Sequence, residues 1–496
     1  TAQRPARHPG DPEGLMEAGE DRPRVGVDEW VASHDDRLAE RTGFAGLARK
    51  IDDRVPAWAR LTLFAAIAAT LPLWMGRGDL FAYGIFTLIY ILLGLGLNVI
   101  VGNAGLLDLG YVALFGFGAY FYALLSSEHY GIHWPSAISI PVVVVSTALL
   151  GLVLGIPSRR LLGDYLAIVT LFFGQAFVVF VNAANPTVAG HGLTGGPNGI
   201  ADIDPNDIFG YDLSSRTQQY YFILVVVLLV LIGLQFLSES RTGRAWRALR
   251  EDPLAAEAMS MPVNRLKLMA FAFGAGIAGL AGCIFAAVLT AVTSGNFALP
   301  ILITIYAVVI LGGIGSLTGV VIGAIVINVS FQFLAPENPQ QNARILFYAV
   351  IVLLLLLGAR PWWRSGVVLA GVAVLGFAAH AVAEAISSSW TAGPVVEGGR
   401  LADAISEWVI IPAGHDRFAN AAYITLVVLI LTLTRVHGWW RTGLLVPTIY
   451  LTAIVWETSF VEQPAVARWI LFGALLVFLM TVRPQGLLGT PRVEIV

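Results

Sequence analysis

The sequence predicts an all-α polytopic integral membrane protein with about fourteen transmembrane helices, some of them broken or closely packed at glycine-rich segments. Two observations carry this fold class. The hydrophobic fraction is 57% and the charged fraction only 13%, with a mean hydropathy of +0.75. Apolar runs long enough to cross a bilayer follow one another almost without pause. The composition excludes a soluble globular protein, and a net charge of −3 gives no reason to expect a nucleic-acid partner.

The first segment, 1–59, differs from the rest of the chain. Residues 1–60 hold ten basic and twelve acidic side chains, which is too polar and too long for a secretory signal peptide. We expect a mostly disordered cytoplasmic tail. Hydropathy then predicts spans at 60–75, 80–101, 105–125, 137–157, 164–183, 219–237, 268–289, 299–312, 318–335, 344–359, 366–386, 419–434, 443–457 and 467–482.

Charge sets the predicted orientation of these spans. With the loop 241–267 in the cytoplasm, the inner loops hold fourteen basic residues and the outer loops six. This bias predicts that both termini are cytoplasmic. The loop 184–218 would then be external, and it carries four aspartates, Asp202, Asp204, Asp207 and Asp212.

The loop 241–267 carries six of the thirty basic residues between two long apolar runs. Asp252 and Pro253 form a helix start, with Asp252 as N-cap and proline at the first helical position. The predicted helix is short and ends near Met259, because Pro262 cannot continue it. A short polar helix at the inner face is a surface that a separate protein could bind.

Glycine is dense in two hydrophobic regions, 102–120 and 311–323. Irregular backbone at membrane depth survives only where it is buried or lines a cavity, and glycine also permits close helix packing. For the first region, cavity lining and packing both remain open. For the second, the orientation favours a cytoplasmic turn.

The chain shows no catalytic or metal-binding motif. A Walker A loop needs Gly-Lys-Ser/Thr, but the only lysines, Lys50 and Lys267, follow arginine and leucine. Histidines such as His191 and His415 are scattered, with no metal-ligand spacing. We therefore expect no enzyme activity, no metal and no cofactor on this chain, so any ATP and Mg²⁺ would be bound by other polypeptides.

Six segments in order resemble the LivM-type permease of branched-chain amino acid ABC importers, in the LivH/LivM family that also includes urea and short-amide permeases. They are 103–120, 163–175, 193–200, 241–267, 278–285 and 311–319. The resemblance covers roughly 80–359, and residues 483–489 resemble the usual end of that family.

The resemblance implies a multi-pass permease subunit in a bacterial plasma (inner) membrane, importing branched-chain or other neutral amino acids. Its implied partners are a second, LivH-like permease, two ABC ATPase subunits, an extracytoplasmic solute-binding protein and membrane lipid. Urea or short-amide transport is an alternative within the family. An ion-coupled secondary transporter is an alternative of another class, but it predicts several intramembrane carboxylates, where the spans offer Asp108 and Glu384.

The resemblance also assigns candidate site residues. ATPase coupling falls on Arg250, Glu251, Asp252, Ala256, Glu257, Ala258 and Ser260. The family-motif loop comprises Thr194, Gly195, Gly196, Pro197, Asn198 and Gly199. Candidate residues of the translocation path are Asp108, Tyr111, Tyr165, Thr170 and Gln175.

Three of these positions depart from the family pattern: Asp108 replaces a small polar residue, Gln175 a glutamate and Ser260 a glycine. A carboxylate at membrane depth costs about 2.5–3.5 kcal/mol on insertion scales. Asp108 is therefore expected to face a hydrated path or a partner, unless it lies near the cytoplasmic mouth.

The predicted domains are the tail, a permease core at 60–360 with its coupling loop at 239–267, and two further segments. Residues 361–466 would be an extra transmembrane insertion with an outer loop near 387–418. Residues 467–496 would be a terminal span and a cytoplasmic tail. The segments 343–361 and 467–484 resemble each other, so the insertion separates two versions of one span.

Overall fold

The computed structural model describes residues 57–158, 164–183, 187–188, 191–208, 211–333, 347–349, 351–352, 363–393, 404–412, 415–436, 439–462 and 473. The predicted tail therefore lies outside the described residues, apart from its last three. So do most of the predicted span 344–359 and all but one residue of the span 467–482.

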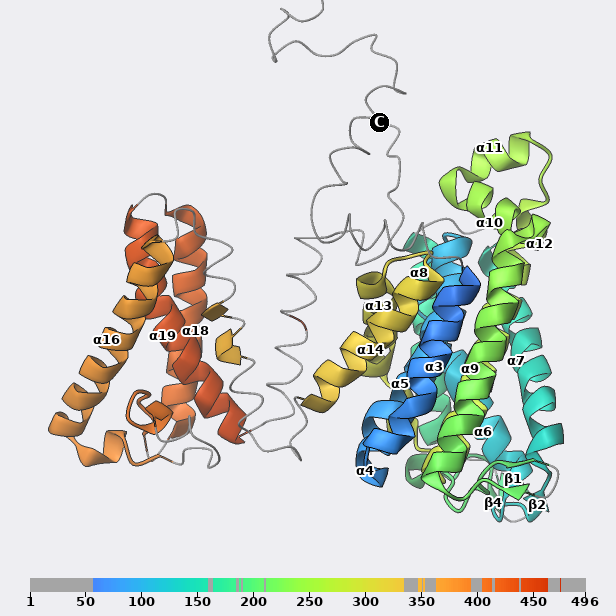
Figure 1. Ribbon diagram of the computed structural model, residues 1–496, viewed down its shortest axis with the longest axis horizontal. Helices are drawn as coiled ribbons and strands as arrows, with labels where there is room; N and C mark the ends of the chain where they lie inside the picture. Colours follow the sequence, from blue (N-terminus) through green and yellow to red (C-terminus); the bar gives the residue numbers. More distant parts are fainter. Residues whose placement is uncertain are drawn as a thin grey trace, which may run out of the picture. The chain divides into compact units, whose positions relative to one another are not determined.

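The described chain is mainly helical (Figure 1). Its longer helices are α3 (Ala57–Trp74), α5 (Phe86–Leu97), α6 (Tyr111–Leu125), α7 (Ser136–Ser158), α8 (Asp164–Ala183), α9 (Arg216–Glu239), α10 (Arg241–Glu251), α12 (Val263–Leu289), α13 (Leu299–Gly312), α14 (Leu317–Phe333), α16 (Trp363–Ile386), α18 (His415–Arg435) and α19 (Trp439–Glu462). The shorter helical pieces are α4 (Arg77–Asp79), the π-helical η2 (Leu80–Ile85) and η3 (Asn98–Asn103), α11 (Pro253–Ala258), and the 3₁₀ turns η4 (Gly196–Asn198), η5 (Ser294–Phe297) and η6 (Ser388–Trp390).

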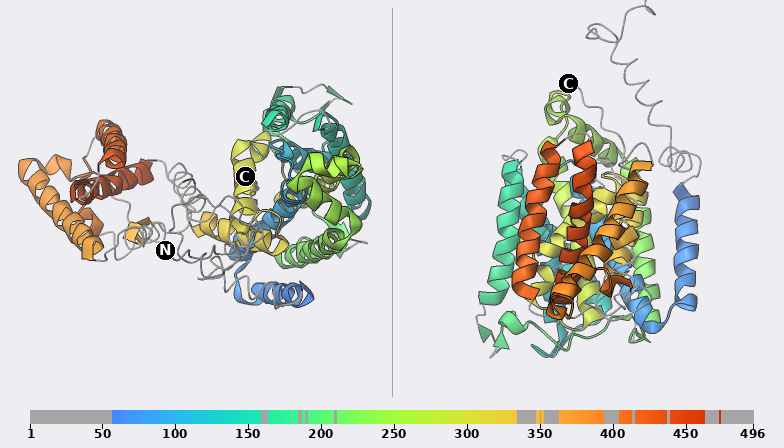
Figure 2. Two further views of the ribbon diagram at one scale, coloured as in Figure 1. Left: turned by 90° about the horizontal axis from the view of Figure 1, so that it is seen from above. Right: turned by 90° about the vertical axis from the view of Figure 1, so that its left-hand side faces the viewer.

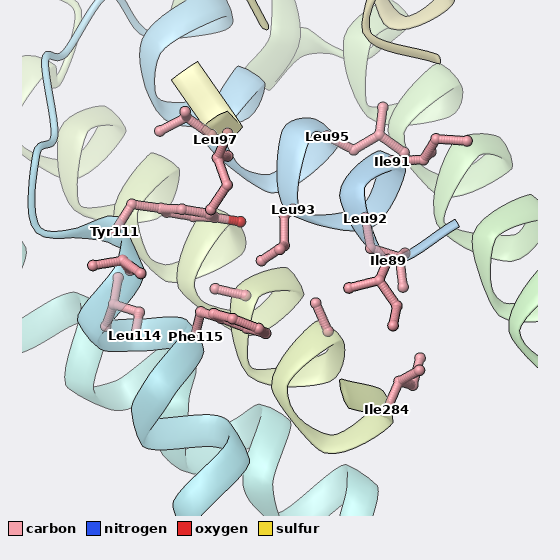
Figure 3. Close-up of a cluster of buried hydrophobic side chains, with 14 of the residues drawn as sticks. Ile89, Ile91, Leu92, Leu93, Leu95, Leu97, Tyr111, Leu114, Phe115 and Ile284 are labelled. Atoms are coloured by element: carbon pink, nitrogen blue, oxygen red, sulfur yellow. The ribbon is translucent and has the colours of Figure 1, made fainter. Parts of the chain in front are cut away.

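The helices from α3 to α14 form one bundle, seen end-on in the left view of Figure 2. This bundle overlaps the predicted permease core, and we keep that name for it. Its central members are α5 and α12: α12 packs against α5, α6 and α7, while α13 and α14 pack against α5. Among the described helices that could span a membrane, Arg77–Asn103 is the most enclosed, with 83% of its apolar stretch buried. Figure 3 shows side chains of α5 meeting Tyr111 and Phe115 of α6 and Ile284 of α12.

Short hairpins close one end of the core, opposite to α10 and α11 in Figure 1. The pairs are β1 (Ser126–Ser127) with β2 (Ile132–His133), β3 (Thr187–Val188) with β4 (His191–Gly192), and β5 (Asp207–Ile208) with β6 (Tyr211–Asp212), all antiparallel. These two-residue strands are the exceptions to the predicted all-α class. We call this the hairpin end and the opposite one the α10 end.

Seven described helices are long and apolar enough to cross a membrane: Arg77–Asn103, Ser136–Pro157, Tyr165–Ala183, Arg216–Glu239, Val263–Leu289, Ser294–Gly312 and Gly366–Ile386. Four predicted spans correspond to shorter apolar helices, at Trp58–Trp74, Tyr111–Leu125, Leu317–Gln332 and Asn420–Leu433. The predicted span 443–457 lies within α19, which is not among the seven. The polytopic fold is therefore confirmed among the described residues, and the count of fourteen stays a prediction.

The helices α16, α18 and α19 form a second group with a core of its own. Both α16 and α18 pack against α19, and Val368, Val372 and Ile454 are among the buried residues between them. Aromatic contacts add to this packing, since Phe347 stacks on Trp456 with ring centroids 4.4 Å apart. This core shares no residue with the buried cluster of the permease core.

Candidate functional site

The segment after α9 is a helix-turn-helix that lies at the α10 end of the core (Figure 1). Ser240 caps α10 by accepting a hydrogen bond from the Gly243 N–H at 3.2 Å. One face of α10 is buried through Gly243, Trp246 and Leu249, three residues apart each time, and the arginines between them point outward. The fully buried Trp246 donates a hydrogen bond from Nε1 to the Leu266 carbonyl at 2.9 Å. One face of α10 is thus anchored on α12.

In contrast, α11 is exposed almost all round. Asp252 caps it by accepting hydrogen bonds from the N–H groups of Leu254 at 2.8 Å and Ala255 at 3.0 Å. Proline occupies the first helical position, and α12 begins directly after Pro262. Ala256 is the buried residue of α11, whereas Leu254 is 77% exposed. The predicted start and length of this helix are confirmed.

The coupling candidates therefore divide by position. Glu251, Asp252, Glu257, Ala258 and Ser260 are exposed, Ala256 is buried, and Arg250 is half-buried. Ser260 has a left-handed backbone with φ of 58°, which accounts for the glycine that the family pattern places there. Sequence reasoning did not foresee that the first half of the loop is itself helical, although its apolar residues repeat every three positions.

Beside α10, one of the two longest helical spans of the core is interrupted. The helix through α5 ends with π-helical η3 at Asn103, and α6 begins only at Tyr111. Gly105 adopts φ of +70°, a conformation that other residues rarely take. Backbone groups freed by an interruption must find partners when no water is near. The interruption, residues 104–110, is therefore expected to depend on contacts from other elements.

The structure supplies those contacts from several helices. Tyr306 of α13 donates its hydroxyl hydrogen to the Asp108 carbonyl at 2.6 Å. The Leu109 N–H donates to Thr170 Oγ1 of α8 at 2.9 Å. Asp108 accepts a hydrogen bond on Oδ1 from the Gly110 N–H at 2.9 Å. A broken helix whose Asp108 carbonyl, Leu109 N–H and Gly110 N–H all have hydrogen-bond partners is thus embedded in the core.

Asp108 itself is 2% exposed, so it lies inside the subunit and not at an open mouth. Its second carboxylate oxygen, Oδ2, has no hydrogen-bond partner among the described residues. A buried polar group without a partner is costly, and more so if charged. The site therefore holds an acceptor whose bonding capacity is not used by the described part of the chain.

The five path candidates do not gather at one place. Asp108 and Thr170 lie together at the interruption, and Tyr111 is fully buried in the core with its hydroxyl against Gly96 (Figure 3). Tyr165 and Gln175 are exposed on α8, Tyr165 to 72%. On α8 they follow the same outward stripe as Phe172, which is 70% exposed. Their role as a lining stays a prediction.

The family-motif loop lies at the hairpin end. Hydrogen bonds connect it to α8 and, through Ile200, to the segment that follows α12. Thr194 donates its hydroxyl hydrogen to the Val181 carbonyl at 2.8 Å. Ile200 and Val292 exchange two backbone hydrogen bonds, at 3.0 and 2.8 Å. Gly195, Gly196 and Gly199 all have positive φ, and Pro197 and Asn198 lie in η4, so the motif encodes a particular turn. The predicted turn is confirmed at this position.

A histidine–aspartate pair lies at the same end. His133 Nδ1 lies 2.6 Å from Asp204 Oδ2, and both side chains are partly exposed. The hydrogen bond to Asp204, together with the charge of that carboxylate, raises the pKa of His133. The pair joins the first hairpin to the loop before β5.

Sequence reasoning missed Asn98 and Tyr306, which hold the segments around the interruption, and Trp246, which anchors α10 on α12. Asn98 Oδ1 accepts a hydrogen bond from the Gly315 N–H at 2.8 Å, across 217 positions. Asn98 and Tyr306 interrupt otherwise apolar runs, and this was the only signal that could have marked them.

Comparisons with known proteins agree with this architecture. Residues 80–355 match the family described as "Branched-chain amino acid transport system / permease component". The LivM permease of the high-affinity branched-chain amino acid transport system is 36% identical over 301 residues in Salmonella typhimurium, covering 56% of this chain and 68% of that protein. The Escherichia coli LivM protein is 37% identical over 303 residues, with the same two coverages. The LivH permease of Salmonella typhimurium is 26% identical over 146 residues, 29% of this chain and 47% of its own. No solved structure gave a significant match. The chain belongs to the permease family of branched-chain amino acid transport systems.

Proposed function

We propose that this chain is a transmembrane permease subunit of an ATP-binding-cassette importer that moves branched-chain or other neutral amino acids into the cytoplasm. The observation that carries the proposal is the exposed helix α11, which lies inside the family-matched region and is rigidly capped by Asp252. Such a helix at one end of a bundle offers a separate motor subunit a surface to bind. The named relatives support the substrate class.

The proposal includes partners and orientation. Two ATPase subunits bind at the α10 end and carry ATP and Mg²⁺, which places that end in the cytoplasm. An extracytoplasmic solute-binding protein delivers substrate at the hairpin end. A second permease completes the pathway, as the similarity to both LivM and LivH proteins suggests. The chain then crosses a bacterial inner membrane fourteen times, with both termini in the cytoplasm and lipid around the bundle.

We place the translocation path along the interruption and the outer stripe of α8. Asp108 and Thr170 lie at the interruption, and Tyr165 and Gln175 face outward from α8, where the second permease would pack. Tyr111 supports the path from behind, because its side chain is fully buried. A mostly apolar path with few polar groups suits an aliphatic amino acid.

The test is transport by the complete complex in proteoliposomes. We expect saturable uptake of radiolabelled leucine that requires ATP, both ATPase subunits and the solute-binding protein. Unlabelled valine and isoleucine should compete, and urea should not. Uptake driven by an ion gradient without ATP would support a secondary transporter instead, and competition by urea alone would indicate a short-amide permease.

A further inference from the structure

Arg250 connects the coupling segment, which comprises α10 and the exposed α11, to the interrupted helix. It is the last but one residue of α10, two positions before the cap of α11. Its guanidinium donates a hydrogen bond from Nη1 to the Gly102 carbonyl at 2.6 Å, across 148 positions of sequence. Gly102 lies in the last turn of η3, directly before the interruption. Helix ends leave carbonyls without intrahelical partners, and a cation is stabilising there.

Glycines in two segments make room for this side chain. A Cβ at Gly105 would lie 3.0 Å from Arg250 Cγ, and one at Gly315 would lie 2.5 Å from Arg250 Nη1. Gly315 also donates its N–H to Asn98 Oδ1 at 2.8 Å, which fixes the turn between α13 and α14 against η3. The guanidinium thus lies where α10, the interruption and that turn meet.

The two ends of the 104–110 segment are held differently. Arg250 of α10 holds the turn just before it, whereas Tyr306 of α13 and Thr170 of α8 hold Asp108 and Leu109. Because α11 is exposed and follows α10 with only the cap residue Asp252 between them, we expect a load applied to α11 to reach the interruption through the Arg250–Gly102 hydrogen bond. Trp246 of α10 and its cap residue Ser240 bond instead to α12 and α9.

We propose that Arg250 is a positioning residue that transmits displacement of the coupling segment to the interrupted helix, and so couples ATP hydrolysis to opening of the path. This inference rests on the proposed function. Arg250 acts through the backbone of Gly102, and not by touching the substrate. Its loss should therefore leave ATPase binding intact while separating hydrolysis from transport.

The experiment compares Arg250→Ala and Arg250→Lys with the wild-type complex in proteoliposomes. The readout is the number of ATP molecules hydrolysed per leucine imported. We expect a several-fold rise for Arg250→Ala with ATPase subunits still co-purifying. Arg250→Lys should lie in between, because an ammonium can restore one hydrogen bond to Gly102 but not the planar guanidinium.

Arg216→Ala is the matched control. Arg216 also donates a hydrogen bond from Nη1 to a helix-end carbonyl, that of Val288 at 3.0 Å, but at the hairpin end. The Arg216→Ala variant should lower the thermal stability about as much as Arg250→Ala does, but it should leave the ATP-to-leucine ratio unchanged. A normal ratio in Arg250→Ala would overturn the inference, and so would loss of the ATPases, which would assign Arg250 to docking. Absence of ATP-dependent leucine uptake in the wild-type complex would instead reject the proposed function.

Discussion

At the scale of single residues, Ser260 shows how a substitution can fit a turn at a cost. Its φ of 58° lies in the left-handed region, where side chains other than glycine are disfavoured by roughly 1–2 kcal/mol. The residue is exposed, so no packing contact offsets this strain. Ser260→Gly should therefore raise or preserve the thermal unfolding midpoint in detergent, and Ser260→Val should lower it. A lower midpoint for Ser260→Gly than for wild type would contradict the assigned backbone conformation.

Asp108 supports a second prediction at this scale. If its unpartnered oxygen faces the path, it should attract a substrate ammonium group, and removing the charge should change selectivity more than stability. Asp108→Asn keeps an Oδ1 acceptor for the Gly110 N–H, so the interruption should persist. We expect relative uptake of neutral amino acids and amides to change on the order of ten-fold, which corresponds to about 1.4 kcal/mol.

The measurement is competitive uptake in proteoliposomes, with expression and thermal stability recorded for each variant. Asp108→Ser restores the small polar residue of the family pattern and serves as the second variant. Unchanged selectivity in both, at normal expression, would show that Asp108 only stabilises the fold.

Residues also show what sequence could and could not predict. Asp252 and Pro253 were predictable because capping depends on neighbours two or three positions away. The bond from Arg250 to Gly102 spans 148 positions, and its existence depends on how two helices pack. Composition and motif order sufficed for the membrane class and the family, but Asn98 and Tyr306 could not be assigned without the tertiary fold.

At the scale of elements, glycine brings α6 and α12 into close contact. A Cβ at Gly118 would lie 2.5 Å from the Gly279 Cα, and one at Gly282 would lie 2.5 Å from the Phe115 carbonyl oxygen. For this stretch of the glycine-rich region the structure shows helix packing, one of the two interpretations that sequence left open. Whether the region also lines a cavity stays a prediction.

This contact makes Gly118→Ala destabilising. An added methyl group would meet backbone, which cannot move aside without shifting a helix, and overpacking costs typically about 1–3 kcal/mol. Gly276→Ala on α12 is the control, since its Cβ would meet nothing closer than the Ala148 Cβ at 3.6 Å. Thermal unfolding in one detergent should show a lower midpoint for Gly118→Ala only. Equal midpoints for both variants would mean that α6 and α12 are not in such close contact.

At the scale of the whole molecule, the chain combines a family core with a further helical group. The family match ends at residue 355, before α16 begins at Trp363. The group of α16, α18 and α19 buries its own apolar residues, and none of them belongs to the permease core. The coupling segment lies wholly within the core. The two separate cores are consistent with the boundary near 361 that the sequence predicts. The boundary itself stays a prediction.

These separate cores predict that the ATPases bind without the added helices. Deleting 365–465 joins the two similar segments, 343–361 and 467–484, through a short connection, and leaves α10 and α11 untouched. We expect the shortened chain to insert in the membrane and to co-purify with its ATPase subunits at wild-type ratio. Replacing 253–259 with a glycine-serine linker is the control, and it should lose them while keeping all helices of the added group. A bundle with its own apolar interior should be removable without effect on an exposed helix that lies outside it. If the deletion variant inserted but lost the ATPases, the added helices would therefore belong to the part of the chain that docks the ATPases.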